Sequence, residues 1–457
     1  MNHTTRSSLG LLCTMLSGLM AFLVITVWWT RSIGASHGTI TLFVTGDTRG
    51  YLEPCGCRRD QAGGLPARMT LIRQDTSSEH LLVDVGNLTS GGRAYELLKL
   101  NYLLKGLNQI GYHALNLGRR EAGLDRDALA AIIRESQAPF VSCNVMDRAK
   151  STPLAEPYRL FTVGGVRIGI TGVTEAPEDE VGPGVMVRPA AEALAQTLPK
   201  MKQLCDYVIV LAFASSETLK TLAARFHEID CLLGGDVPQS SERAERLNRA
   251  VAFNVTDKGK VLGKLTFRRN DHSLELTDSA ALKVKDSISP APEMTALLAA
   301  YRNELRERNL EFATGEELEP IASVRATADT YVGQDACAPC HPKAHQISLA
   351  AAHSHAYQTL VQKKAEYDPE CLRCHTVGYG ARDGFISMER TPQFAGVQCE
   401  TCHGRAGEHV KSMKNGLQRA STFRPVTPNS CIRCHDEEND GRFDFTHDWA
   451  MIKHGAE

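Results

Sequence analysis

The sequence lacks an excess of either charge. Its 51 Lys and Arg residues are matched by 53 Asp and Glu residues, so the 457-residue chain carries a formal charge of −2 at pH 7. Nucleic-acid binding requires a basic footprint that this balance does not supply. The charge balance therefore argues against a nucleic-acid partner, and net charge alone steers other partners only weakly.

The N-terminal segment lacks a good cleavage site. Arg6 precedes an uncharged run whose apolar core extends from Leu9 to Trp29, and residues 32–36 do not form an Ala-x-Ala-like site. At 1.5 Å per residue the core is about 31 Å long as a helix, which matches the hydrocarbon thickness of a bilayer. We predict one transmembrane helix within residues 1–37 that remains as an anchor, with a cleaved signal peptide as the alternative.

Cysteine, by contrast, is abundant, with 14 residues, and eight of them form four Cys-x-x-Cys-His motifs. This motif attaches c-type haem through two thiols, and its His is the proximal iron ligand. Zinc also binds paired cysteines but gives no reason for a His after every pair. Residues 327–457 are thus predicted to be a tetrahaem cytochrome c domain with four covalent haems. The motifs are Cys337-Cys340-His341, Cys371-Cys374-His375, Cys399-Cys402-His403 and Cys431-Cys434-His435.

Covalent haem attachment also predicts a location. In bacteria c-type haem is attached on the outer side of the inner membrane, so the chain is expected to be exported. Together with the predicted anchor, this places the protein in the inner membrane as a single-pass protein with its bulk in the periplasm.

Five cysteines lie outside both the motifs and the anchor, and the compartment is oxidising. Cys143, Cys205 and Cys231 fall in apolar runs and are expected to be inert core thiols. Cys55 and Cys57 form a Cys-x-Cys pair in a predicted loop. A redox or metal-binding role and a structural crosslink are both open for this pair, because a disulfide between such close cysteines is strained and labile.

Residues 38–289 alternate short apolar runs with amphipathic segments, which predicts a layered α/β domain with mixed sheets flanked by helices. Gly164-Gly165 is expected at a hairpin turn. Residues 290–326 are predicted to be a helix, at about Glu293–Asn309, followed by a linker from Phe312. The main predicted strands are Thr39–Thr45, Leu81–Val85, Phe140–Val145, Tyr207–Ala212, Cys231–Leu233, Ala250–Val255, Val261–Arg269 and Ser273–Lys283; the predicted helices are Ala67–Gln74, Ala94–Gln109, Arg126–Glu135, Ala190–Leu204 and Ser216–Phe226.

The segments Thr45–Gly50, Leu82–Asn87, Asn116–Glu121 and Leu233–Asp236 resemble, in order, the N-terminal metallophosphatase domain of 5′-nucleotidases. The resemblance covers about Thr39 to Arg269. It implies the fold of that domain and a position for two metal ions that activate water for phosphoester hydrolysis. The haem region stands where those enzymes have their nucleotide-binding domain.

Most of the metal ligands that the resemblance implies are replaced. Asp47 matches the first ligand, but Arg49, Asn87, Arg119 and Arg120 stand at ligand positions, and so do Phe213, Asp236 and Pro238. We therefore expect no dinuclear metal centre and doubt phosphoesterase activity. Two roles are open for Arg49, Arg119 and Arg120: they form an anion site, since guanidinium binds oxyanions well, or they pair internally with Asp47, Glu121 and Asp236.

The haem region has a resemblance of its own. Tyr331–Cys337, Thr376–Tyr379, Gly396–Gly404 and the segment from Phe443 to His454 are similar to the tetrahaem cytochrome c family that accepts electrons from hydroxylamine oxidoreductase. This resemblance implies short helices around closely packed haems, three irons with a distal His and one, at His375, without. The distal candidates are His353, His409 and His454, whereas His345, His355 and His447 are expected at the surface.

The sequence thus predicts a membrane-anchored periplasmic electron carrier fused to a metallophosphatase-like domain that does not hydrolyse its ancestral substrates. Other redox proteins or quinol-linked membrane complexes are the expected partners. Two alternatives are a multihaem reductase of a small oxyanion, and a metal-dependent phosphoesterase linked to a cytochrome.

Overall fold

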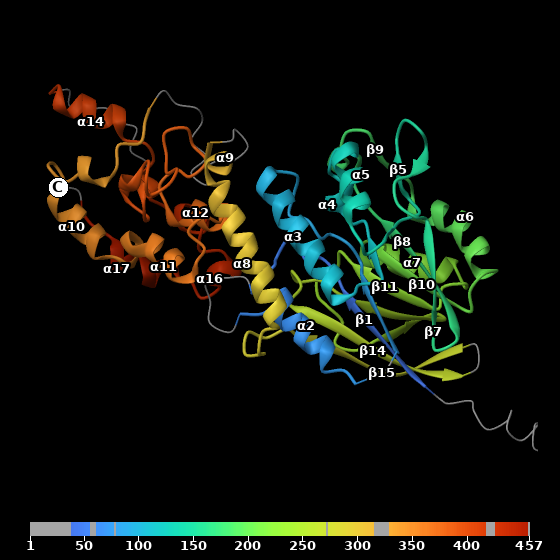
Figure 1. Cartoon of the computed structure of the whole chain (residues 1–457). Helices are drawn as coiled ribbons and strands as arrows, with labels where there is room; N and C mark the ends of the chain where they lie inside the picture. Colours follow the sequence, from blue (N-terminus) through green and yellow to red (C-terminus); the bar gives the residue numbers. More distant parts are fainter. Residues whose placement is uncertain are drawn as a thin grey trace, which may run out of the picture.

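The computed structural model describes residues 38–54, 61–76, 79–270, 273–314, 329–416 and 426–455 (Figure 1). The predicted N-terminal helix and the Cys55/Cys57 loop lie outside these residues. Within the described ranges, no helix is both long and apolar enough to cross a membrane.

The first sheet of the N-terminal domain has six strands in the order β15-β14-β1-β2-β3-β4. β1 runs parallel to β2, with Thr45 beside Asp84, and antiparallel to β14. The sheet is therefore mixed, as the alternating pattern predicted. Its strands are β1 (Thr39–Thr45), β2 (Glu79–Asp84), β3 (Ala114–Asn116), β4 (Phe140–Val141), β14 (Val261–Asn270) and β15 (Ser273–Lys283).

The second sheet also has six strands, in the order β12-β13-β11-β10-β8-β7. The β7–β8 hairpin turns at Gly164 and Gly165, whose φ angles are 58° and 77°. Two successive positive φ angles favour glycine and suit a tight hairpin, so the predicted hairpin is confirmed. The strands are β7 (Tyr158–Val163), β8 (Val166–Thr174), β10 (Tyr207–Phe213), β11 (Cys231–Gly235), β12 (Glu245–Leu247) and β13 (Ala250–Asn254).

One sequence prediction fails here. Phe140–Val145 was expected to be a single strand, but the chain leaves the first sheet after Val141 and enters a small sheet of β5 (Val145–Asp147), β6 (Thr152–Pro153) and β9 (Val185–Val187). The cause is Asn144, whose buried amide donates to the carbonyls of Thr174 (2.7 Å) and Arg188 (2.8 Å). A buried amide that bonds to two loops fixes a change of direction that apolar periodicity does not reveal.

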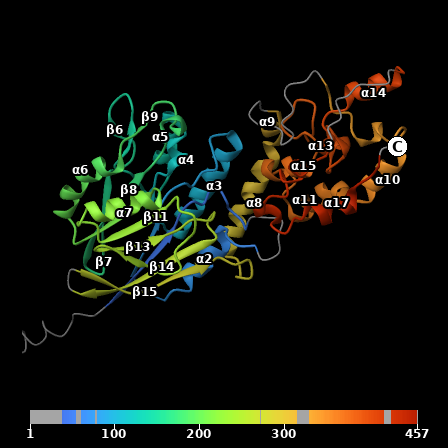
Figure 2. The ribbon, with the colours of Figure 1, turned by 180° about the vertical axis from the view of Figure 1, so that it is seen from behind.

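The two large sheets face each other across an apolar core, and helices cover their outer faces (Figures 1 and 2). Ile40, Leu42 and Val44 of β1 meet Ile170 of β8 and Ile209 of β10 in this core. Cys231 lies in the same core, while Cys143 and Cys205 lie under the helices of the second sheet. The helices are α2 (Leu65–Arg73), α3 (Ala94–Ile110), α4 (Arg119–Ala122), α5 (Arg126–Glu135), α6 (Ala190–Lys202) and α7 (Ser216–Arg225), with a 3₁₀ turn at Glu178–Glu180.

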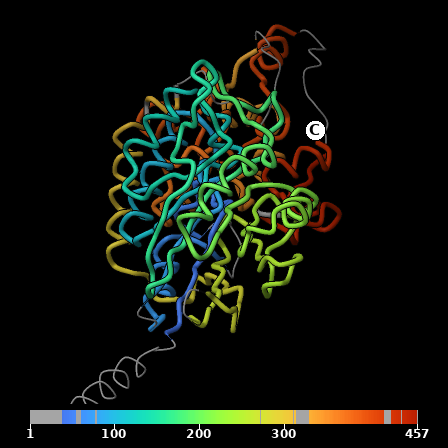
Figure 3. The backbone as a smooth tube through the Cα atoms, turned by 90° about the vertical axis from the view of Figure 1, so that its right-hand side faces the viewer, coloured from blue at the N-terminus to red at the C-terminus, as the bar shows by residue number. Residues whose placement is uncertain are grey.

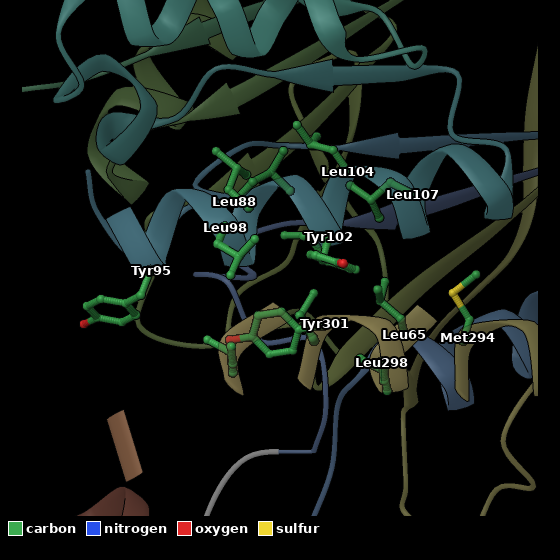
Figure 4. Packing of buried hydrophobic residues seen from close by; sticks show 14 of the residues in the cluster. Leu65, Leu88, Tyr95, Leu98, Tyr102, Leu104, Leu107, Met294, Leu298 and Tyr301 are labelled. Carbon is green, nitrogen blue, oxygen red and sulfur yellow. The ribbon is translucent and has the colours of Figure 1, made fainter. Parts of the chain in front are cut away.

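Helix α8 (Pro292–Glu307) packs on α2 and α3 (Figure 4). Its buried face carries Met294, Leu298, Tyr301 and Leu305, which confirms the predicted amphipathic helix. The predicted linker begins later than expected, because α9 (Asn309–Thr314) continues the helical path and buries Phe312 and Ala313. Alanine, threonine and glutamate are weak indicators of a linker when one aromatic residue can anchor another turn.

The C-terminal domain consists of short helices and loops, and in Figure 3 it lies behind the N-terminal domain. Among residues 329–416 and 426–455, β pairing is limited to an isolated bridge between Thr376 and Ala395. The helices are α10 (Pro342–Ala350), α11 (Ala356–Lys363), α12 (Pro369–His375), α13 (Cys399–His403), α14 (Gly407–Lys414), α15 (Pro428–Cys431), α16 (Glu437–Asp440) and α17 (Phe445–Ile452), with 3₁₀ turns at Gln334–Ala336, Ala352–His355 and Pro392–Phe394.

Candidate haem sites and the site at the sheet edge

Each Cys-x-x-Cys-His motif adopts a helical turn. The backbone amide of His341 donates to the carbonyl of Cys337 (2.9 Å), and His435 makes the same bond to Cys431 (2.9 Å). In such a turn the first Cys, the second Cys and the His are at positions i, i+3 and i+4, which share one helix face. Two thiols and one imidazole are thus presented together, as covalent haem attachment needs.

Three of the motif histidines each face a second imidazole. The ring centroids are 6.4 Å apart for His341 and His409, 5.9 Å for His435 and His353, and 5.9 Å for His403 and His454. A metal–imidazole bond is about 2 Å long, so two bonds plus the two ring radii total about 6 Å. The spacing of all three pairs therefore fits one iron held between two imidazoles.

His375, in the second motif, has a different environment. Its Nδ1 donates to the carbonyl of Ala356 (2.7 Å), with the Thr359 hydroxyl at 3.3 Å. This bond fixes the tautomer in which Nε2 has its lone pair available for a metal. Burial lowers the pKa of His375, which favours the neutral, ligating form. Among the described residues, no second imidazole ring is stacked or tilted against His375.

Two of the other histidines also bear on ligation. His435 donates from Nδ1 to Asp440 (2.8 Å), an orienting contact like that of His375. Burial lowers the pKa of His353, and the charges of His435 and His375 lower it further. His353 is therefore neutral at physiological pH, which is the state that binds iron.

The three histidines predicted at the surface are not paired with a motif histidine in the described part of the chain. His447 is 77 % exposed and bonds Asp448 at 2.8 Å, which raises the His447 pKa. His355 is exposed, but the prediction for His345 is wrong, because its side chain is only 16 % exposed and lies 3.6 Å from Asp335. The structure thus brings His353, His409 and His454 to the motifs and leaves these three aside.

The motifs are also close to one another in pairs that sequence order does not suggest. Cys337 lies close enough to Cys399 for each to affect the pKa of the other, and the same holds for Cys374 and Cys434. The first motif is therefore beside the third, and the second is beside the fourth. Burial and the nearby Cys431 raise the pKa of Cys402 to about 11, so the third and fourth motifs are neighbours as well.

A buried carboxylate inside the third motif was not singled out from the sequence. Glu400 is 1 % exposed and accepts hydrogen bonds from the backbone amides of Val332 (3.0 Å), Gly333 (2.7 Å) and Ala406 (3.0 Å). Burial raises the Glu400 pKa, against the lowering effect of these bonds. The interaction ties the start of the domain to the third motif. The residues between motif cysteines are unspecified in the pattern, so the motif alone could not reveal this role.

At the edge of the first sheet, Asp47 is 1 % exposed and saturated with donors. Its carboxylate accepts two bonds from Arg49 (2.7 and 2.9 Å), one from Asn87 (2.7 Å) and one from Thr256 (2.9 Å). Asp47, Arg49, Asn87 and Asp236 all have left-handed backbones, with φ of 53°, 48°, 66° and 58°. Such conformations cost about 1–3 kcal/mol each and gather at functional sites.

The arginines at this edge are engaged by acceptors of the chain itself. Arg119 pairs with Asp236 and donates to the carbonyl of Glu175 (3.2 Å), while the Arg120 guanidinium donates to the carbonyl of Ser90 (2.5 Å). Arg49 thus pairs with Asp47 and Arg119 with Asp236, as the internal-pairing alternative predicts. This pairing does not extend to Glu121.

Glu121 serves the loops instead. Its carboxylate accepts from the backbone amides of Asn87 (2.8 Å), Thr89 (2.8 Å) and Gly118 (2.7 Å). Burial raises the Glu121 pKa. Within the described ranges, no group of three or more His, Cys, Asp or Glu side chains is placed to hold one metal ion.

Comparison with known proteins divides the chain in the same way. Residues 336–404 match the family model of cytochrome c554 and c-prime. Cytochrome c-554 of Nitrosomonas europaea is 31 % identical over 101 residues, which are 18 % of this chain and 43 % of that protein. The C-terminal part is therefore similar to cytochrome c554, and c-type haem is the cofactor of that family.

The N-terminal part is similar to 5′-nucleotidases. The snake venom 5′-nucleotidase of Gloydius brevicauda is 26 % identical over 239 residues, which are 47 % of this chain and 40 % of that protein. The crystal structure of a 5′-nucleotidase precursor from Thermus thermophilus has a TM-score of 0.51 at 21 % identity, covering 60 % of this chain and 61 % of that one, which shows a shared fold. The chain thus spans 40 % of the first of these relatives and 61 % of the second, less than two thirds in each case.

Proposed function

We propose that this protein is a tetrahaem c-type cytochrome that carries electrons in the periplasm, anchored to the inner membrane by its N-terminal helix, with an N-terminal domain that does not hydrolyse phosphoesters. The three imidazole pairs carry the proposal. Together with the attachment motifs, these pairs would hold each of three haem irons between two imidazoles. When bound, the haems supply reversible one-electron uptake.

The protein's own part is to hold and orient these groups. The thiols anchor each porphyrin, and hydrogen bonds at Nδ1 fix the His375 and His435 rings. Because cysteines of the first and third, the second and fourth, and the third and fourth motifs are neighbours, the four attachment points form one connected group. A connected group of redox centres supports electron transport in preference to four isolated sites.

The His375 site supports a second candidate function. Among the described residues no second imidazole is paired with His375, whose Nδ1 bonds the Ala356 carbonyl, so an iron held there would have no second histidine ligand from these residues. The second candidate is reduction of a small oxyanion at this iron. An open position is a requirement for such chemistry rather than proof of it, and the imidazole pairs favour electron transport as the main role.

The contacts of Asp47 support the proposal that the N-terminal domain is not hydrolytic. Metal-assisted hydrolysis needs carboxylates and imidazoles that are available to bind two ions. Here the one carboxylate retained from the resemblance accepts four internal hydrogen bonds, two of them from a guanidinium. The remaining alternative, a working phosphoesterase, requires metal-dependent release of phosphate from a nucleotide by the purified protein.

The haem proposal is tested by counting haems and spin states. The mature protein, denatured as its pyridine complex, should contain four covalent haems per chain, and Cys371→Ala/Cys374→Ala should remove one. In the native protein three irons should be low-spin and one high-spin. His454→Ala should raise the high-spin fraction from one iron to two, and the matched control His447→Ala should leave it unchanged. Two or fewer haems in a fully matured sample would overturn the proposal.

Location and partners follow from the same proposal. The protein should fractionate with inner membranes, with the haem domain accessible to protease from the periplasmic side. Its electron donors and acceptors are proposed to be other redox proteins or quinol-linked membrane complexes. Recovery of a water-soluble protein that lacks residues 1–37 would show that this segment is a cleaved signal peptide and not an anchor.

A further inference from the structure

The second haem motif belongs to a region of the C-terminal domain that meets the N-terminal domain. Leu372 and Tyr379 are fully buried, and they belong to the same apolar cluster as Tyr95 and Leu98 of α3 and Tyr301 of α8. The cluster runs without interruption from one domain to the other. The haem attached at Cys371 and Cys374 is therefore the one whose protein surroundings the N-terminal domain helps to build.

Within this interface α3 contributes one buried cation. The side chain of Lys99 is 6 % exposed, and its Nζ lies 2.5 Å from Oε2 of Glu370. Glu370 is the residue immediately before Cys371. The Tyr51 ring covers Lys99 from the other side, with the Lys99 Nζ 5.5 Å from its centroid. Burying an ammonium group is strongly unfavourable unless it is paired, so Lys99 requires the Glu370 carboxylate in order to be buried in this interface.

The charges around Lys99 are not balanced by that one pair. Burial lowers the pKa of Lys99, yet the Glu370 and Asp368 charges raise the pKa above its ordinary value, so Lys99 stays protonated. Asp368 caps α12 by accepting from the Glu370 amide (2.9 Å), and Lys99 opposes the effect of burial on the Asp368 pKa. One cation from the first domain thus faces two carboxylates at the start of the second haem motif.

We infer that Lys99 is a positioning residue by which the N-terminal domain sets the reduction potential of the haem attached at Cys371 and Cys374. Adding an electron to a haem is favoured by a nearby positive charge and opposed by negative charges. These interactions are strong at a site shielded from water. Lys99 offsets the carboxylates of Glu370 and Asp368, and it keeps this haem easier to reduce than the carboxylates alone would allow.

This inference rests on the proposed tetrahaem function and adds a role for the N-terminal domain. A domain that has lost its metal ligands can persist because its helix α3 forms one wall of a redox site. The rival explanation is that Lys99 and Glu370 only hold the two domains together. The two explanations predict different signs when the charges are removed one at a time.

The test is a spectroelectrochemical titration of the full-length holoprotein at pH 7, after a pyridine assay has established four haems. The high-spin haem gives the signal of interest. Lys99→Met should shift its midpoint potential downward, and Glu370→Gln should shift it upward. The double variant Lys99→Met/Glu370→Gln should return close to the wild-type value, and the other three haems should move less in every case.

Two controls separate charge from packing. Lys99→Arg retains the cation and should retain the potential, even if the new side chain fits less well. Lys105→Met removes an exposed lysine from the same helix and should leave the potential unchanged. Shifts of the same sign in Lys99→Met and Glu370→Gln would indicate loosened packing and overturn the inference. Absence of any shift would overturn it as well, whereas a haem count below four in the wild-type protein would instead contradict the proposed function.

Discussion

The two domains of this protein differ in how much of their apolar surface they bury by themselves. The N-terminal domain encloses residues such as Val44, Leu211 and Leu233 between two sheets and under helices. In the C-terminal domain, buried apolar residues gather around the second motif, beside the other domain. Among the described residues, most exposed large hydrophobic side chains also belong to the C-terminal domain: Ile347, Leu349, Val361, Met388, Met413, Ile432 and Met451, against Leu160 and Leu204 in the N-terminal domain.

This difference shows where each domain obtains its stability. The sheets and helices of the N-terminal domain bury enough of their own apolar surface to be stable without a cofactor. Short helices of four to nine residues are marginal by themselves and need packing partners. The four proposed porphyrins would provide such partners, so the C-terminal domain is expected to depend on its cofactors for a packed interior.

The largest effect should come from withholding haem. With all eight motif cysteines changed to Ala, the C-terminal domain should lose its fold and become sensitive to protease, because its interior packing is removed. The N-terminal domain should survive as a resistant fragment that ends near Thr314. Limited proteolysis with mass spectrometry measures this. If the C-terminal domain stayed resistant to protease without haem, it would not depend on its cofactors for a packed interior, and the proposed difference between the two domains would be wrong.

A second experiment tests the independence of the N-terminal core. Phe253 is fully buried between the sheets, and Phe253→Ala should lower the free energy of unfolding by about 3–5 kcal/mol. Haem content and spin state should stay unchanged below the unfolding transition. Leu160→Ala, at a side chain that is 41 % exposed, is the matched control and should cost far less. Chemical denaturation followed by far-UV circular dichroism gives the free energy of unfolding of both variants.

Asp84 gives the N-terminal core a pH dependence of its own. Burial raises its pKa from 3.8 to about 6, against the lowering effects of Thr45 and the Gly86 amide. A pKa raised by folding means that the contribution of Asp84 is fully favourable below pH 4 and is lost as pH rises through 6. Asp84→Asn should therefore gain stability relative to wild type between pH 4 and 7, by up to roughly 3 kcal/mol. A difference in unfolding free energy that did not change with pH would show that Asp84 is ionised in the folded protein.

The smallest effect is expected at the sheet edge. Arg49 is 37 % exposed but Asp47 is buried, so Arg49→Ala should cost about 1–2 kcal/mol, because it removes two bonds from a buried carboxylate. The variant should also remain unable to release phosphate from nucleotides with Mn²⁺ or Zn²⁺, because Asn87, Arg119 and Arg120 still occupy ligand positions. Thermal unfolding and a phosphate assay measure the two outcomes. Metal-dependent hydrolysis by Arg49→Ala would show that one arginine alone blocks a retained metal centre.

Much of this architecture could be predicted from local patterns. Two adjacent glycines predict the hairpin at Gly164-Gly165. The spacing of Met294, Leu298 and Tyr301 predicts the amphipathic helix α8. The haem attachment positions likewise follow from a short motif. Each of these features depends on residues that are close in sequence.

Features that depend on contacts between residues far apart in the sequence could not be predicted from such local patterns. Asn144 breaks a predicted strand through carbonyls about 30 and 44 positions away. The assignment of His409 to His341, of His353 to His435 and of His454 to His403 arises from folding of the whole domain. The contact between Lys99 and Glu370 joins residues 271 positions apart, and neither residue stands in a motif.

The continuous apolar cluster between the domains also bears on how the protein is made. If the chain is exported as proposed, the N-terminal domain leaves the translocation channel first and can complete its sheets while the C-terminal segment is still extended. Leu372 lies between the two cysteines of the second motif and Tyr379 follows the motif, and both are buried in one cluster with side chains of α3 and α8. The N-terminal domain is then a template on which the second motif docks after its haem has been attached. In a chain without this template, biogenesis should stall at the second motif in particular.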